Sequence, residues 1–222
     1  MWELEKFSKL YHGDCSVYCS NNMSEIIRFF LPIYFVVYFG IAFVLKSIIV
    51  AKRIGKNPFV IPKDDSAYGL IGFYFKLTLI VMFIYTNAYA FFPEWHNAFL
   101  PIEQLNWNYL KVLGFVLLGI SLAWTVIAQT HMKNSWRIGI DATMKTELIT
   151  TGLFSVSRNP IFFGMILSLL GVFLTTPNAL TLLFLILGYV LIQIQIRLEE
   201  DFLTQEHGQI YLDYKKSVRR LI

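Results

Sequence analysis

The sequence predicts an all-α membrane protein, a polytopic bundle of about five transmembrane helices, on the evidence of its composition and its apolar runs. Of the 222 residues, 56% are hydrophobic and only 15% are charged, whereas a soluble globular domain carries about 25% charged residues. Twenty Phe and twelve Tyr suit lipid-facing and interfacial surfaces. Five apolar runs divide the chain. We therefore expect residues 1–222 to form a single integral membrane domain.

The first three runs are long enough to cross a bilayer core, which takes about 20 residues. They cover roughly Ile26 to Val50, Leu70 to Phe92 and Tyr109 to Ala128. Their sequences show no polar cluster, and we expect residues 1–128 to be a three-helix scaffold. Lys46, Lys76 and Lys111 lie near the ends of these runs. We interpret them as side chains whose ammonium groups reach the membrane interface, without a chemical role.

The last two runs predict a helical hairpin, from about Ile161 to Thr175 and from Ala179 to Ile196. The uncharged segment Thr175-Thr176-Pro177-Asn178 joins them, and its Pro and Asn suit a helix stop and restart. Further on, apolar residues recur with helical spacing, which predicts an amphipathic arm on the cytoplasmic surface; they are Phe202, Leu203, Ile210, Tyr211 and Tyr214. Most unexplained polar residues follow the third run, so residues 129–222 are expected to be the functional half.

The distribution of positive charge predicts the orientation. Lys and Arg occur in the loops after the first and third runs and in the tail, whereas the loop from Pro93 to Asn108 has none. By the positive-inside rule, the N-terminus is expected outside and the C-terminus in the cytoplasm. We interpret the chain as a multi-pass protein, of a bacterial inner membrane.

Composition also excludes some partners. The net charge is +4, and no basic stripe is interleaved with stacking aromatics, so nucleic acid is not expected as a partner. Cys15 and Cys19 have CxxxC spacing without a second pair, and the His residues are scattered. No metal site is therefore predicted, and a short disulfide or two separate thiols both remain open.

Two polar segments flank the predicted hairpin. In the first, Pro160 suits the first turn of a helix and Asn159 its N-cap, and free backbone amides there can hold a carboxylate; a plain helix start is the alternative. In the second, Glu199 and Glu200 could bind an ammonium or sulfonium group, or they could form a solvated face with ion pairs to Arg197. A hairpin would return both segments to one side and build a polar site at the membrane surface.

A further polar and aromatic cluster follows the third run, formed by Gln129, His131, Trp136 and Arg137. Arg137 suits carboxylates and phosphates and could hold an anionic head group. An interfacial aromatic belt with positive-inside charge is the alternative interpretation.

Together these segments resemble the isoprenylcysteine carboxyl methyltransferases, and the pattern recurs in related phospholipid N-methyltransferases. The resemblance covers roughly Gln129 to the C-terminus and rests on Leu148-Ile149-Thr150-Thr151-Gly152-Leu153-Phe154, Arg158-Asn159-Pro160-Ile161-Phe162-Phe163-Gly164, Glu199-Glu200-Asp201-Phe202-Leu203 and Gly208-Gln209-Ile210-Tyr211-Leu212-Asp213-Tyr214. The chain departs from the family where Asn159 replaces a His and where Phe154 and Phe162 replace Tyr.

The resemblance implies a membrane-bound methyltransferase that uses S-adenosylmethionine and acts on a lipophilic acceptor. An isoprenylcysteine-type carboxylate or thiol is the first choice of acceptor, and a phospholipid amine is the second. The chain could instead be an NADPH-dependent membrane reductase of the sterol type, or a non-enzymatic membrane protein. The acidic pair Glu199-Glu200 disfavours the phosphates of a dinucleotide.

By the same resemblance, Glu199 or Glu200 would hold the ammonium group of the cofactor, while Arg158 and Asn159 would hold its carboxylate. The whole implied cofactor site comprises Leu148, Gly152, Phe154, Arg158, Asn159, Pro160, Phe162, Gly164, Glu199, Glu200, Tyr211 and Tyr214. The acceptor would contact Gln129, His131, Trp136 and Arg137. Arg137, Arg158 and Asn159 are the residues expected to act in catalysis.

Overall fold

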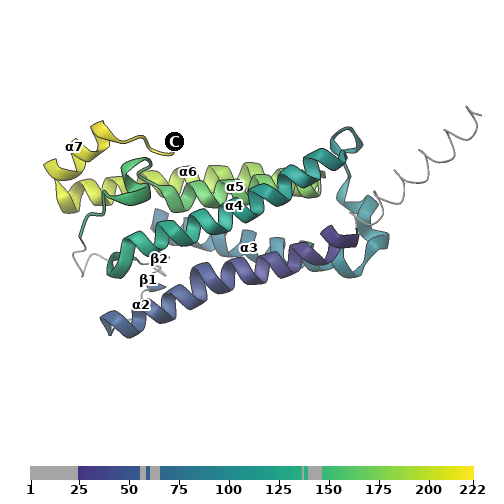
Figure 1. Ribbon diagram of the computed structural model, residues 1–222, viewed down its shortest axis with the longest axis horizontal. Coiled ribbons are helices and arrows are strands. Elements are labelled where there is room, and N and C mark those ends of the chain that lie inside the picture. The colour runs from purple at the N-terminus through teal and green to yellow at the C-terminus, as the bar shows by residue number, and fades with distance from the viewer. Residues whose placement is uncertain (1–24, 56–58, 61–65, 137, 140–146) are drawn as a thin grey trace, which may run out of the picture.

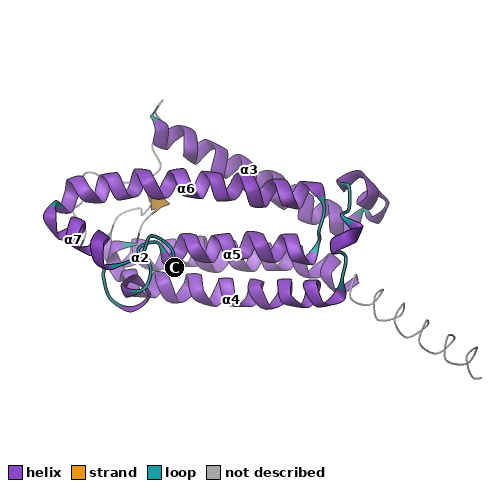
Figure 2. Ribbon diagram, turned by 90° about the horizontal axis from the view of Figure 1, so that it is seen from above, coloured by secondary structure: helices purple, strands orange, loops and turns teal. Residues whose placement is uncertain are grey.

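Long helices lie side by side along one axis in the computed structural model, which describes residues 25–55, 59–60, 66–136, 138–139 and 147–222 (Figures 1 and 2). The helices are Glu25–Ile54, α3 (Ala67–Phe91), α4 (Asn108–Met132), α5 (Pro160–Thr175), α6 (Ala179–His207) and α7 (Gln209–Ser217). Among the described residues, four of them are long and apolar enough to cross a membrane, and α5 is a shorter apolar helix of 16 residues. The predicted all-α polytopic bundle is therefore confirmed. Cys15 and Cys19 lie outside the described residues.

The helix Glu25–Ile54 is interrupted near its middle by a π-helical segment, Gly40–Leu45, after which α2 (Lys46–Ile54) completes it. A π-helical turn displaces carbonyl groups from the regular α-helical bonding pattern. The side chain of Gln129 in α4 donates a hydrogen bond of 2.7 Å to the carbonyl of Ala42 inside this segment. Gln129 therefore joins the first helix to α4.

A row of hydroxyl contacts continues this junction along the same two helices. Tyr34 and Ser121 are hydrogen-bonded at 2.8 Å, and Tyr38 and Thr125 at 3.0 Å. Partners on each helix are four residues apart, so they share one face. The expectation that the first three apolar runs carry no polar cluster was wrong, because these hydroxyls are separated by whole helical turns in the sequence.

Glycines hold α5 close against α4. A Cβ atom at Gly164 would clash with Oγ1 of Thr125, and one at Gly171 would lie 2.8 Å from Cγ of Leu118. Small residues at such crossings let the backbones of membrane helices approach closely. The indole of Trp124 adds a hydrogen bond of 2.9 Å to the carbonyl of Pro160. These contacts fix the position at which α5 begins.

The predicted hairpin is formed by α5 and α6. Asn178 caps α6 by accepting a hydrogen bond of 2.9 Å from the Thr181 amide, and the Thr181 hydroxyl accepts one of 3.2 Å from the Asn178 amide. This reciprocal arrangement is a capping box, so the expected helix stop and restart is confirmed. Helix α6 continues to His207, beyond the apolar run that ends near Ile196, and Glu199 and Glu200 lie within it.

Two short strands join loops at the end of the bundle where α5 begins. β1 (Phe59–Val60) pairs in parallel with β2 (Ile138–Gly139). The pairing links the loop after α2 to the loop after α4, as Figure 1 shows. The C-terminal end of α6 and helix α7 lie at this same end, so the segments that were predicted to form the polar site come together there (Figure 2).

Candidate functional site

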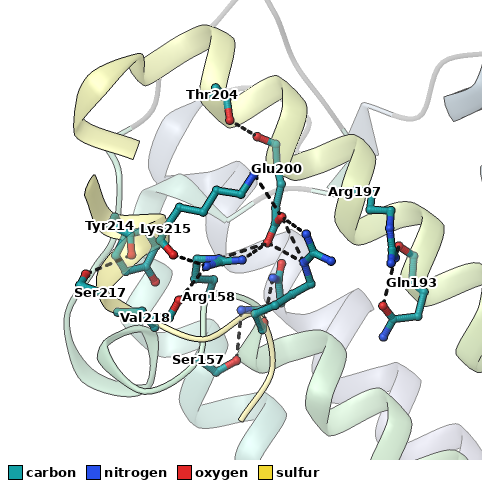
Figure 3. Close-up of polar contacts among 12 residues, drawn as sticks. Ser157, Arg158, Gln193, Arg197, Glu200, Thr204, Tyr214, Lys215, Ser217 and Val218 are labelled. Carbon is teal, nitrogen blue, oxygen red and sulfur yellow. Dashed lines mark hydrogen bonds and ion pairs between the residues drawn. The ribbon is translucent and has the colours of Figure 1, made fainter. Parts of the chain in front are cut away.

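A buried ion pair joins the start of α5 to the last part of α6 (Figure 3). Nη2 and Nε of Arg158 donate hydrogen bonds of 2.8 and 3.1 Å to Oε1 of Glu200. The side chains are 7% and 2% exposed, respectively. Nη1 of Arg158 donates to the carbonyls of Lys215 and Val218, at 2.7 Å each. The Arg158 guanidinium therefore links α6 and the C-terminal segment to the turn before α5, which contains Arg158 and Asn159.

Glu200 also binds cations from the C-terminal segment. Nη2 of Arg220 donates a hydrogen bond of 2.8 Å to Oε2, and Nζ of Lys215 lies 3.7 Å from the same oxygen. The hydrogen bond to Glu200 raises the pKa of Arg220, so Arg220 stays charged at physiological pH. A buried carboxylate is tolerated only when it is paired and hydrogen-bonded. Glu200 meets both conditions.

The C-terminal tail returns along the turn before α5. The carbonyl of Arg219 accepts a hydrogen bond of 2.9 Å from the Arg158 amide, and the carbonyl of Arg220 accepts one of 3.0 Å from Nδ2 of Asn159. Asn159 occupies the predicted N-cap position of α5, but its side chain makes no capping bond within the described structure. It binds the tail instead.

Aromatic side chains attach α7 to the loop that precedes the turn. The Tyr214 hydroxyl donates a hydrogen bond of 2.5 Å to the carbonyl of Phe154, which lies in the 3₁₀ helix Gly152–Ser155. Burial raises the pKa of Tyr214 to about 12, so the hydroxyl keeps the proton that it donates. The ring of Tyr211 is also buried and lies 6.0 Å from that of Tyr214. The predicted aromatic residues of the arm are therefore brought together with Phe154.

The loop also contacts a residue predicted for the acceptor. Gly152 has a φ of +65°, a conformation that favours glycine. A Cβ atom there would lie 2.6 Å from Cε1 of His131. The Leu153 amide donates a hydrogen bond of 3.4 Å to Nδ1 of His131. The structure therefore places His131 directly against the loop that leads to Arg158.

The remaining predicted site residues do not contact the Arg158–Glu200 pair in the contacts described. Gln129 is buried between helices and Gly164 packs against α4, as described above. Trp136 is buried, whereas Leu148 and Phe162 are half-buried. Arg137 lies outside the described residues, so its predicted role in acceptor binding and catalysis stays a prediction.

The two adjacent acids of α6 have different surroundings. Glu199 is half-buried and accepts a hydrogen bond of 2.9 Å from Nε2 of Gln195. The hydroxyl of Tyr68, at the start of α3, is buried and has no hydrogen-bond partner among the described residues, and it is close enough to Glu199 and Asp201 for their charges to act on it. A buried polar atom without a partner is costly. Nothing in the sequence around Tyr68 singled it out.

Residues 109–210 match a family model described as Phospholipid methyltransferase. The match begins in α4 and ends in α7, so it includes the Arg158–Glu200 pair and leaves out the first helix, α3 and the tail. It supports a similarity to the broad group of membrane methyltransferases and not to the isoprenylcysteine group in particular. Searches among curated proteins and among solved structures found no match.

Proposed function

We propose that the chain is a membrane-bound methyltransferase that takes a methyl group from S-adenosylmethionine and transfers it to a lipophilic acceptor. The observation that carries this proposal is the buried Arg158–Glu200 pair, which holds the turn before α5 beside the acids of α6. This arrangement lies within the region similar to phospholipid methyltransferases. The position of the site at one end of a membrane-type bundle suits a water-soluble donor and a lipid-borne acceptor.

The charges around each acid favour one of the two for the cofactor. The carboxylate of Glu200 is already bound by Arg158, Arg220 and Lys215, so it does not fit a further ammonium group. Glu199, the adjacent acid of α6, is half-buried, and no cation of the C-terminal segment that the structure describes is paired with it as Arg220 is with Glu200. It accepts a hydrogen bond from Nε2 of Gln195 and is near enough to Tyr68 for its charge to act on that hydroxyl. We assign the ammonium of the cofactor to Glu199, and we assign to Glu200 and Arg158 the role of positioning residues.

The chemistry of the donor makes small demands on the protein. A sulfonium-bound methyl group is transferred by in-line displacement, with the donor leaving as a neutral thioether. What the chain must do is hold the two reactants aligned and near contact, and alignment alone can contribute about 7–11 kcal/mol. The 3₁₀ helix Gly152–Ser155 is held by α7, and the turn before α5 is held by the C-terminal tail. Both segments can therefore form a rigid wall that keeps the reactants aligned.

The acceptor class decides whether a base is needed. An isoprenylcysteine-type carboxylate or thiolate is already anionic and attacks without losing a proton. A phospholipid amine, which the description of the matching family favours, is an ammonium at neutral pH and must first lose a proton. A basic group near the bound amine would have to accept that proton. His131 lies against the Gly152–Ser155 segment, but its Nδ1 accepts a hydrogen bond from the Leu153 amide, so the neutral ring carries its proton on Nε2 and we do not assign it as that base.

Calorimetry of the detergent-purified chain tests the donor. We expect S-adenosylmethionine to bind, and we expect Glu199→Gln to weaken its binding by about tenfold to a hundredfold, because a hydrogen bond to a charged group contributes about 1.5–3 kcal/mol. Glu94→Gln, at an exposed site, is the matched control and should bind normally. Binding of NADPH alone would favour a reductase, and binding of neither would favour a non-enzymatic protein.

A further inference from the structure

A polar cavity lies at the other end of the bundle from Arg158 and Glu200. Its volume is about 320 Å³, and it is lined by the first helix, the end of α3, the 3₁₀ helix Pro93–Phe99, the start of α4 and the turn between α5 and α6. Ligand pockets commonly start at about 300 Å³. Helix α5 runs from the first site to Thr175 at this cavity, and a helix of this length spans about 24 Å. The two sites are therefore separate.

Positive charge exceeds negative charge in the lining of this cavity. Arg28, Lys111 and His96 line it, and Glu25 is the acid that lines it with them. Arg28 and Glu25 form an ion pair at 3.5 Å. Lys111 is therefore a cation of the lining in addition to the Arg28–Glu25 pair. His96 adds a ring nitrogen that can donate a hydrogen bond. The lining would thus attract an anion.

Lys111 is the residue that most requires a ligand. It is only 6% exposed, and its ammonium group has no hydrogen bond or ion pair among the described residues. The charge that acts on it, Glu103, belongs to an exposed side chain. Burying an ammonium group is costly unless a counter-charge is near. The sequence predicts that its ammonium group reaches the membrane interface, and in the structure Lys111 lies in the wall of this cavity.

The surroundings of the cavity indicate a ligand from the membrane. Exposed Trp95, Trp107 and Tyr109 lie in the segments around it, and such aromatic residues are typical of the head-group level of a bilayer. Ile26 and Phe29, next to Arg28 and Glu25 on the first helix, are exposed apolar side chains. They provide a surface along which an acyl chain can lie.

We propose that this cavity binds the phosphate group of an anionic membrane lipid, with Lys111 and Arg28 as the cations that contact it. Lysine and arginine are the side chains that most often bind phosphate. This lipid is not the methyl acceptor, because its phosphate would lie at the end of the bundle opposite Glu199. The inference does not depend on the proposed transferase activity.

Native mass spectrometry of the full chain in detergent tests the proposal, with three probes: dioctanoyl phosphatidylglycerol, inorganic phosphate and uncharged dioctanoylglycerol. We expect the phosphatidylglycerol to bind, and Lys111→Met to weaken it by at least tenfold. Lys76→Met is the matched control, because Lys76 is an exposed lysine of an apolar helix outside the cavity. This variant should bind phosphatidylglycerol as tightly as the parent chain does. The uncharged lipid should not bind at this site.

The fold is checked by thermal unfolding, and Lys111→Met should unfold at the same temperature as the parent chain or higher, since it removes the charge from a side chain whose residue is only 6% exposed. Arg28→Gln is a second variant that should also reduce phosphatidylglycerol binding. Equal binding in the parent chain and in both variants would overturn the proposal, as would equal binding of dioctanoylglycerol. Tighter binding of inorganic phosphate than of the lipid would overturn the assignment to a membrane lipid.

Discussion

Arg158 and Glu200 lie 42 residues apart in the chain, and Nη2 of one contacts Oε1 of the other at 2.8 Å. Only the return of α6 alongside α5 makes this contact possible. The same carboxylate binds Arg220 from the tail, so one buried acid joins α5, α6 and the C-terminus. This junction positions the loop, the turn and α7, the elements to which we assign the cofactor.

Glu200→Gln should strongly destabilise this end of the protein. The change leaves Arg158 buried without its counter-charge, and breaking a buried ion pair in this way costs about 3–5 kcal/mol. Denaturant unfolding in detergent measures the loss, with exposed Glu94→Gln as the control. Unfolding curves that coincide with those of the parent chain would show that Glu200 does not hold the junction.

Arg220→Met should destabilise the protein less than Glu200→Gln does. It removes hydrogen bonds from Nε and Nη2 to Glu200, and a hydrogen bond to a charged group contributes about 1.5–3 kcal/mol. Arg219→Met, at a neighbouring exposed side chain, should change the unfolding free energy little. If the two variants lose equal stability, the loss reflects general charge reduction in the tail and not the contact with Glu200.

Gly171→Ala should weaken the packing of α5 on α4. The added Cβ atom would lie 2.8 Å from Cγ of Leu118, and overpacking of this kind costs about 1–3 kcal/mol. Gly119 on α4 has nothing within 4 Å of such an atom, so Gly119→Ala should be neutral or stabilising. The thermal unfolding temperature of Gly171→Ala should therefore fall, whereas that of Gly119→Ala should stay the same or rise.

Gly152→Ala should reduce cofactor binding by displacing the loop. The new methyl group would meet the imidazole of His131, and the φ of +65° is itself unfavourable for alanine by about 1–2 kcal/mol. The double change Gly152→Ala/His131→Ala removes the clash and keeps the backbone strain. Calorimetry with S-adenosylmethionine should show partial recovery in the double variant, and no recovery would mean that the backbone conformation alone is responsible.

Hydropathy and turn residues were sufficient to predict the helices and the hairpin. The five apolar runs, the restart at Asn178 and the return of Glu200 to the side of Arg158 were all predicted, because each depends on local composition or on bilayer thickness. The apolar run predicted for this helix ends near Ile196, whereas α6 continues to His207. Apolar composition marks the part of a helix that suits a bilayer and does not mark where the helix stops.

Contacts between distant segments were not predictable from patterns. The pairing of Glu200 with Arg220 depends on how the tail folds back, and no periodicity encodes that return. The row of hydroxyls from Tyr34 to Thr125 and the burial of Lys111 likewise arise only when helices are packed together. The division of roles between Glu199 and Glu200 is also a tertiary property, since the two are adjacent in sequence and differ only in what surrounds them.

Transfer of a labelled methyl group tests the central proposal most directly. The purified chain is incubated with methyl-labelled S-adenosylmethionine and a membrane lipid extract, and the labelled lipid products are separated and counted. The proposal predicts a labelled lipid with the parent chain and with Glu94→Gln, and at least a tenfold lower yield with Glu199→Gln. No labelled lipid with the parent chain, or equal yields with Glu199→Gln, would contradict it.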